Sequence, residues 1–165
     1  MKNIIIPILC LISLYVQAQS PQSLAVLNYN TLNVNDSSYL RIYNGIIVSN
    51  DYKIQDFEKV NKITREDADQ LGLHTNKPVM LVEYEVDVLE SQIDSILYNR
   101  PAFISNYKFP LSIQLPIAIN NKLLSHEDKK LAFQNLTIKN VKQVEYIDNK
   151  QWNLTAPFGV INIHL

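Results

Sequence analysis

The sequence predicts an α+β fold of small mixed sheets with short flanking helices. Short alternating segments typical of strands are interspersed with short segments of helical periodicity, and turns rich in Asn and Gly separate them. Two parts of the chain also show a similar order of a hairpin, a helix and a closing apolar strand preceded by a proline. We therefore expect one or two α/β units, with an internal duplication as an open alternative.

The N-terminus has the pattern of a signal peptide over residues 1–18. Lys2 precedes an almost unbroken apolar run from Ile4 to Val16, and Ala18 is a small residue at the expected cleavage site. The run is too short to be a convincing membrane span. A lipoprotein cleaved before Cys10 is the alternative, but the apolar run continues past that residue. We expect an exported protein with no transmembrane segment after cleavage.

The composition of the cleaved chain excludes several classes of function. Cleavage leaves 147 of the 165 residues and removes Lys2 and Cys10, so 14 basic and 16 acidic residues remain and no cysteine does. No basic stripe favours nucleic acid, and no polybasic segment favours an anionic membrane surface. Without a disulfide, the chain must be stable through its core alone.

The first half begins with a predicted flexible leader over residues 19–38, followed by a first α/β unit over 39–99. Tyr39–Tyr43 alternates as a half-buried strand, Asn44–Gly45 is a tight-turn pair, and Ile46–Val48 returns as the second strand of a hairpin. The rest of this unit is predicted to contain a short helix over 56–60 and a second helix between Thr64 and Gly72. A strand over 79–86 and an amphipathic helix over 87–98 follow.

The second half begins after a proline-rich connector over residues 100–116. We predict a second α/β unit over 117–165, in which a hairpin turns at Asn120–Asn121 and a helix starts at Ser125 with the outline of a capping box. The strands predicted in this unit are 117–119, 122–124, 141–147 and 158–163.

Three segments of the second unit carry a family resemblance. They are the turn Ile119-Asn120-Asn121-Lys122, the middle segment Ile138–Ile147 and the closing strand Phe158–Ile163. Together they resemble the plug domain of TonB-dependent outer-membrane receptors, especially those of Bacteroidetes. The first half resembles it more weakly, through Asn44-Gly45, Ala68–Gly72 and Pro78–Val82.

The resemblance implies a non-catalytic interaction module that docks to or occludes an outer-membrane β-barrel protein, which is a transporter or a secretion pore. It implies a location in the periplasm or on the periplasmic face of the outer membrane. The chain departs from the family because it is too short to supply a large barrel, shows no TonB-box peptide, and has Asn121 where a glycine is usual. It would therefore be a stand-alone plug-like protein. A periplasmic ligand- or peptide-binding or sensing domain is the alternative, and a small hydrolase is a weaker one.

Residues able to carry chemistry are dispersed along the chain. His74, His126 and His164 fall on different predicted elements, outside any metal-ligand motif. The acidic clusters at 66–69 and 83–87 are expected to form a helix start and a solvated strand face. No nucleophile elbow, P-loop or dinucleotide fingerprint is present. We therefore predict no enzyme activity, no catalytic residue, no metal and no cofactor.

Aromatic residues near the C-terminus are the candidate interface. Tyr146, Trp152 and Phe158 surround a polar stretch, where they would anchor a protein partner or pack beneath the loop as core, and the core alternative is favoured. Ser95, within Asp94-Ser95-Ile96, is a candidate O-glycosylation site because this triplet resembles the short motif of exported Bacteroidetes proteins.

Overall fold

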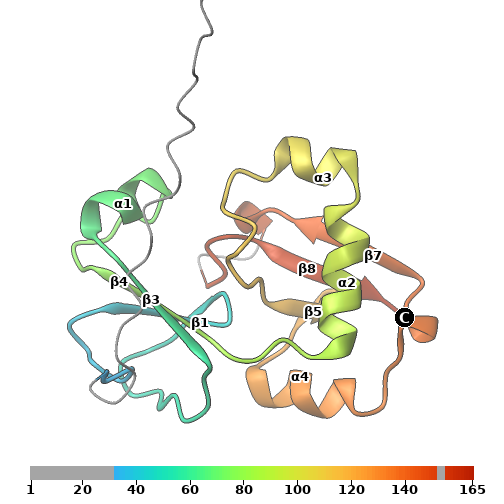
Figure 1. The fold of residues 1–165 in the computed structure, drawn as a ribbon, viewed down its shortest axis with the longest axis horizontal. Coiled ribbons are helices and arrows are strands. Elements are labelled where there is room, and N and C mark those ends of the chain that lie inside the picture. Colours follow the sequence, from blue (N-terminus) through green and yellow to red (C-terminus); the bar gives the residue numbers. More distant parts are fainter. Residues whose placement is uncertain (1–31, 152–154) are drawn as a thin grey trace, which may run out of the picture.

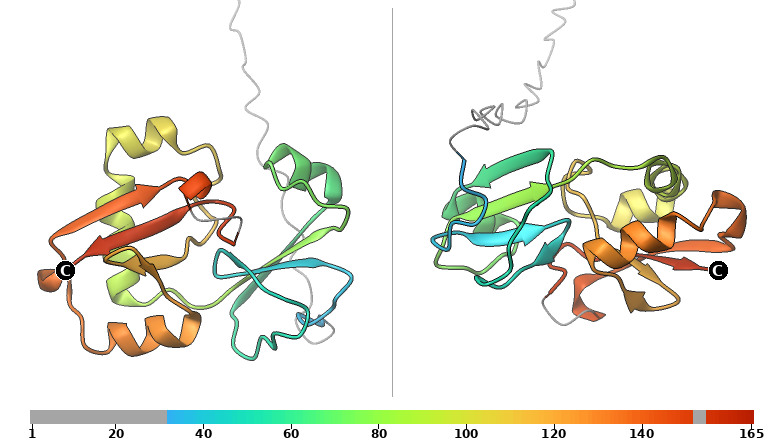
Figure 2. Two further views of the ribbon diagram at one scale, coloured as in Figure 1. Left: turned by 180° about the vertical axis from the view of Figure 1, so that it is seen from behind. Right: turned by 90° about the horizontal axis from the view of Figure 1, so that it is seen from below.

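The structure is a computed structural model that describes residues 32–151 and 155–165. The predicted signal peptide, Cys10, residues 19–31 of the leader and Trp152 lie outside the described residues. The predicted α+β class is confirmed: the described chain forms two four-stranded mixed sheets and four short α-helices. The sheets lie side by side, with α1 at the first sheet and α2, α3 and α4 around the second (Figures 1 and 2).

The first sheet has the strand order β2-β1-β4-β3. Strand β1 pairs antiparallel with β2 and parallel with β4, and β3 pairs antiparallel with β4. The predicted hairpin is confirmed, and Asn44 and Gly45 form its turn with φ of 48° and 77°, a conformation that these two residue types tolerate. The four strands are β1 Leu40–Tyr43, β2 Ile46–Ile47, β3 Lys59–Ile63 and β4 Val79–Glu83.

The second sheet repeats this arrangement with the order β6-β5-β8-β7. Its strand pairs are again antiparallel, parallel and antiparallel, and its turn residues Asn120 and Asn121 have φ of 47° and 66°. The two sheets therefore share strand order, strand direction and turn conformation. The strands are β5 Ile117–Ile119, β6 Lys122–Leu123, β7 Gln143–Ile147 and β8 Val160–His164.

Three of the four α-helices in the described chain begin with a side-chain cap, which the sequence predicted at Thr64 and Ser125. The side chains of Thr64, Asp87 and Ser125 accept hydrogen bonds from backbone N–H groups of the first turn in α1, α2 and α4. The helices are α1 Arg65–Gln70, α2 Val88–Tyr98, α3 Pro101–Asn106 and α4 His126–Phe133, and the short 3₁₀ turns are η2 Ile138–Asn140 and η3 Asn149–Gln151.

Two segments differ from the sequence-based expectation. The predicted helix over 56–60 is wrong. Val60 lies in β3, where it is buried and pairs with Val82 of β4. The connector 100–116, for which no helix was predicted, contains α3. Pro101 opens that helix at a position where its missing N–H costs nothing, and Phe103 anchors it in the core.

Helix α2 packs against the second sheet, although the sequence placed it in the unit 39–99. Its buried residues Leu89, Ile93 and Leu97 share a cluster with Val144 of β7 and Ile161 of β8. In Figure 1 the helix crosses in front of the second sheet. In space, the first half therefore ends near residue 84, and the link to the second half is the short segment 84–87.

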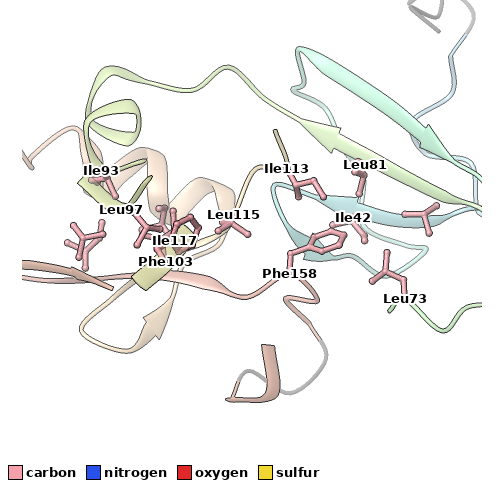
Figure 3. Packing of buried hydrophobic residues seen from close by; sticks show 14 of the residues in the cluster. Ile42, Leu73, Leu81, Ile93, Leu97, Phe103, Ile113, Leu115, Ile117 and Phe158 are labelled. Atoms are coloured by element: carbon pink, nitrogen blue, oxygen red, sulfur yellow. The ribbon is translucent and has the colours of Figure 1, made fainter. Parts of the chain in front are cut away.

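The two sheets share one hydrophobic core. The cluster runs from Ile42 and Leu81 of the first sheet, past Ile113 and Phe158, to Ile117 at the second sheet (Figure 3). The opposite face of the first sheet has a separate small core that includes Tyr43 and Met80 and is covered by residues of the 32–36 and 48–58 segments. The halves are thus joined by burial of apolar surface, the dominant favourable term in folding.

The helices of the described chain are all short. Within residues 32–151 and 155–165, none has the length and apolar character needed to cross a bilayer.

Candidate functional site

Polar residues meet where the β1–β2 turn contacts the start of α4. The Asn44 side-chain oxygen Oδ1 accepts a hydrogen bond from the backbone N–H of Tyr84 at 3.2 Å. The amide nitrogen Nδ2 of Asn44 therefore faces His126, at 3.0 Å from Nδ1. Since an amide nitrogen only donates, His126 Nδ1 accepts, and the imidazole is neutral with its proton on Nε2.

The imidazole of His126 is buried. Its side chain is 7% exposed, and Nε2 has no hydrogen-bond partner among the described residues, with the Asp56 oxygen Oδ2 lying 3.8 Å away. Burial lowers the pKa of His126, and Lys130 and Lys129 lower it further, against opposing effects of Glu127 and Asp56. The site therefore favours neutral histidine.

Two tyrosine rings enclose the imidazole. The Tyr43 ring centroid lies 5.2 Å from that of His126, and the Tyr84 ring packs edge-on at 4.5 Å. The Tyr43 hydroxyl donates to the backbone oxygen of Asp56 at 2.7 Å. These contacts fix the position of the imidazole between the first sheet and α4.

A buried ion pair lies beside the imidazole and joins α2 to α4. The Lys129 ammonium is 2.9 Å and 3.1 Å from the two carboxylate oxygens of Glu90, and both residues are almost fully buried. Glu90 also accepts hydrogen bonds from the Tyr84 hydroxyl at 2.8 Å and from the Gln114 amide at 3.1 Å. Burial lowers the pKa of Lys129, and Glu90 opposes that effect. The partners compensate the desolvation of both charges.

Two adjoining cavities open at this junction. The smaller, of about 110 Å³, has apolar walls from Ile46, Val48, Pro116 and Leu124, and its polar groups are Asn44, Ser125, His126 and Lys129. The larger, of about 330 Å³, is lined by charged residues that include Lys53, Asp56, Glu127 and Lys130. Tyr43, Tyr52 and His126 belong to both. The smaller cavity is of a size for a small apolar group beside polar partners.

The aromatic residues predicted as an interface lie elsewhere. Phe158 is fully buried and its ring packs on Phe109 at 5.1 Å, so it is not available to a partner in this conformation. Tyr146 is half-buried, donates its hydroxyl to the Phe158 backbone oxygen at 3.0 Å, and packs on Phe103. These two residues take the core position that the sequence favoured. Trp152 lies outside the described residues.

The remaining candidates from the sequence do not line the two cavities. Ser95 is exposed on α2, and His74 is exposed after α1. His164 lies on β8, where its Nε2 is 2.7 Å from the carboxylate of Glu145. Among the described residues, no group of three or more His, Cys, Asp or Glu side chains is placed to hold a metal ion.

Sequence reasoning missed the junction because its contacts are long-range. Asn44 was assigned only to a turn and His126 only to a helix start, yet 82 positions separate the two residues. Lys129 gave no local signal either, because a lysine in a charged helical segment is expected to be solvated, and only the structure shows that it is buried.

No family model, curated protein or solved structure matches this chain. The resemblance to plug domains therefore stays a prediction.

Proposed function

We propose that the protein is a non-catalytic exported interaction module that docks to or occludes an outer-membrane β-barrel, a transporter or a secretion pore, from the periplasmic side. The proposal rests in part on the resemblance of segments in residues 117–165 to plug domains. In the structure these residues form the second sheet, with the strand order β6-β5-β8-β7.

An exposed apolar groove between α2 and α4 is the observation that carries the docking proposal. The groove has a volume of about 770 Å³, and its walls include Val88, Leu89, Phe133, Leu136 and Ile138. Val88 is 77% exposed. Contiguous apolar surface left open to solvent is typical of protein interaction sites. We therefore propose this groove as the surface that meets the barrel.

The test is co-purification of the tagged chain with a β-barrel from detergent-solubilised outer membranes. We expect Val88→Glu and Leu136→Glu, at two residues that line the groove, to abolish co-purification, because a buried unpaired carboxylate opposes docking. Ile104→Glu is the matched control, since Ile104 is 49% exposed but lies on α3. A wild-type chain recovered only free in the periplasm would contradict the proposal.

The second candidate function is a stand-alone periplasmic ligand- or peptide-binding or sensing domain. The observation that favours it is the pair of cavities around His126, with a buried imidazole N–H that has no acceptor among the described residues. Ligand-dependent stabilisation of the purified chain, with no associated barrel, would favour this function over the first.

A further inference from the structure

We propose that the Asn44–His126 contact is a pH-sensitive latch, which holds the β1–β2 hairpin against α4 while His126 is neutral and releases it when His126 takes up a proton. This device is independent of which partner the protein meets. It follows from the hydrogen-bonding capacity of two side chains and from the elements that they join.

The orientation of the Asn44 amide is fixed from the first half of the chain. Asn44 donates its backbone N–H to the oxygen of Val82 at 2.9 Å, and its Oδ1 accepts from the N–H of Tyr84 at 3.2 Å. Both contacts tie the turn to the end of β4. The amide nitrogen is thus directed across the junction, and it needs an acceptor there.

Neutral His126 supplies that acceptor, and protonated His126 does not. Both ring nitrogens of a histidinium are donors. A proton on Nδ1 would then face the Asn44 Nδ2 hydrogens across 3.0 Å. Rotating the amide by half a turn would present Oδ1 to the ring, but the Tyr84 N–H would then face the amide nitrogen and lose its acceptor. No orientation of Asn44 serves both neighbours once the ring is charged.

The surrounding charges set the direction in which the ring would move. On α4 itself, Lys129 and Lys130 repel a charged ring, and Glu127 attracts it. Lys129 is paired with Glu90 of α2, and Lys130 with Asp56 of the 48–58 segment at 2.6 Å.

The groups facing the ring from the first half are Tyr43, Tyr52, Tyr84 and Asp56. The tyrosines are uncharged near neutral pH, and burial raises the pKa values of all three. Asp56 is therefore the acceptor in reach, 3.8 Å from Nε2 and on a 61% exposed side chain. A charged ring is drawn toward Asp56 and away from Asn44.

The latch lies next to other contacts between the halves. Gly45, the next residue in the turn, packs on Pro116 just before β5. Ile47 of β2 donates its N–H to the oxygen of Thr155 at 2.7 Å. Release of Asn44 therefore loosens the hairpin at its tip and opens the cavity of about 110 Å³ that Asn44 and His126 both line.

The test is a pH titration of the whole cleaved chain by nuclear magnetic resonance. The imidazole nitrogens of His126 report its protonation. Hydrogen exchange at the Ile47 amide, which donates to Thr155 of the second half, reports the latch after correction for the intrinsic rate. We expect His126 to titrate below the usual histidine range, and protection at Ile47 to fall with the same midpoint. His74→Gln, at an exposed site, should leave both observations unchanged.

Asn44→Asp is the decisive variant. An aspartate accepts hydrogen bonds from both the Tyr84 N–H and a protonated Nδ1, and it also tolerates a positive φ. We expect the midpoint of His126 to rise by about one pH unit or more, because an opposite charge then lies beside the ring. Protection at Ile47 should persist in acid.

Two outcomes would overturn the latch. One is protection at Ile47 that does not change across the midpoint of His126 in the wild-type chain. The other is an unchanged His126 midpoint in the Asn44→Asp variant. His126→Gln should remove the pH response at Ile47, and the aspartate variant keeps the proposal testable if that glutamine chain does not fold.

Discussion

Gly45 shows at the scale of one residue how closely the halves of the chain approach. It has a φ of 77°, and a Cβ atom added there would lie 2.4 Å from Cδ of Pro116 and 2.7 Å from the backbone oxygen of Gln114. Both distances are shorter than the contacts that real Cβ atoms make. Glycine is therefore required twice, for its backbone conformation and for the space that a side chain would fill.

We predict that Gly45→Ala lowers the free energy of unfolding by more than about 2 kcal/mol, because strain at positive φ and a clash with Pro116 add together. Gly72→Ala is the matched control: its φ is 74°, but nothing lies within 4 Å of the added Cβ. It should cost about 1 kcal/mol. Urea denaturation measures both values, and equal losses would show that contact with Pro116 contributes nothing.

At the scale of elements, α2 and α4 are held together by a charge pair in a nonpolar setting. Glu90 accepts from Lys129, Tyr84 and Gln114, so its carboxylate links four segments of the chain. Removing one partner leaves the other charge buried and uncompensated, whereas removing both charges does not.

We predict that Lys129→Met lowers the free energy of unfolding by about 3–5 kcal/mol, because Glu90 then remains buried without a counter-ion. The double variant Lys129→Met and Glu90→Leu should recover at least half of that loss. Chemical denaturation of the wild-type chain, both single variants and the double variant gives the coupling energy. Additive losses would contradict a direct interaction between the two residues.

The elements that the sequence predicted well are those with local signals. Thr64, Asp87 and Ser125 begin helices through their own side chains, and Asn44 with Gly45 forms a turn through its own backbone preferences. Strand β3 was missed because Lys59–Ile63 carries few apolar residues, and its state depends on pairing with β4. The Asn44–His126 site was missed for the same reason, since tertiary contacts decide it.

At the scale of the whole molecule, the two sheets can be compared position by position. When their hairpin turns are aligned, Ile42 and Leu81 of the first sheet correspond to Ala118 and Asn162 of the second. The first pair packs in the shared core, in a cluster that includes Ala68 of α1. Asn162 is also fully buried, but it hydrogen-bonds to Asn121 and Glu145. At these equivalent positions, the first sheet therefore has an apolar pair, whereas the second sheet has a polar network around Asn162.

We predict that the two sheets unfold in one transition, because one apolar cluster joins them. Phe158→Ala should lower stability by about 3–5 kcal/mol and reduce the amide protection of Leu81 in β4 and Ile161 in β8 equally. Ile104→Ala, at a half-exposed site on α3, is the control with little effect. Loss of protection in one sheet alone would show that the sheets fold independently.

The link at residues 84–87 has a consequence for assembly. The described backbone passes only once from the first sheet to the elements around the second, through a segment whose Val86 is 44% exposed. Everything else that joins the halves is non-covalent, so two copies can exchange their second halves and keep every contact of the junction. For the same reason, we expect two separately expressed pieces, divided at this link, to reassemble. Their reassembly would show whether the contacts of the junction are intact.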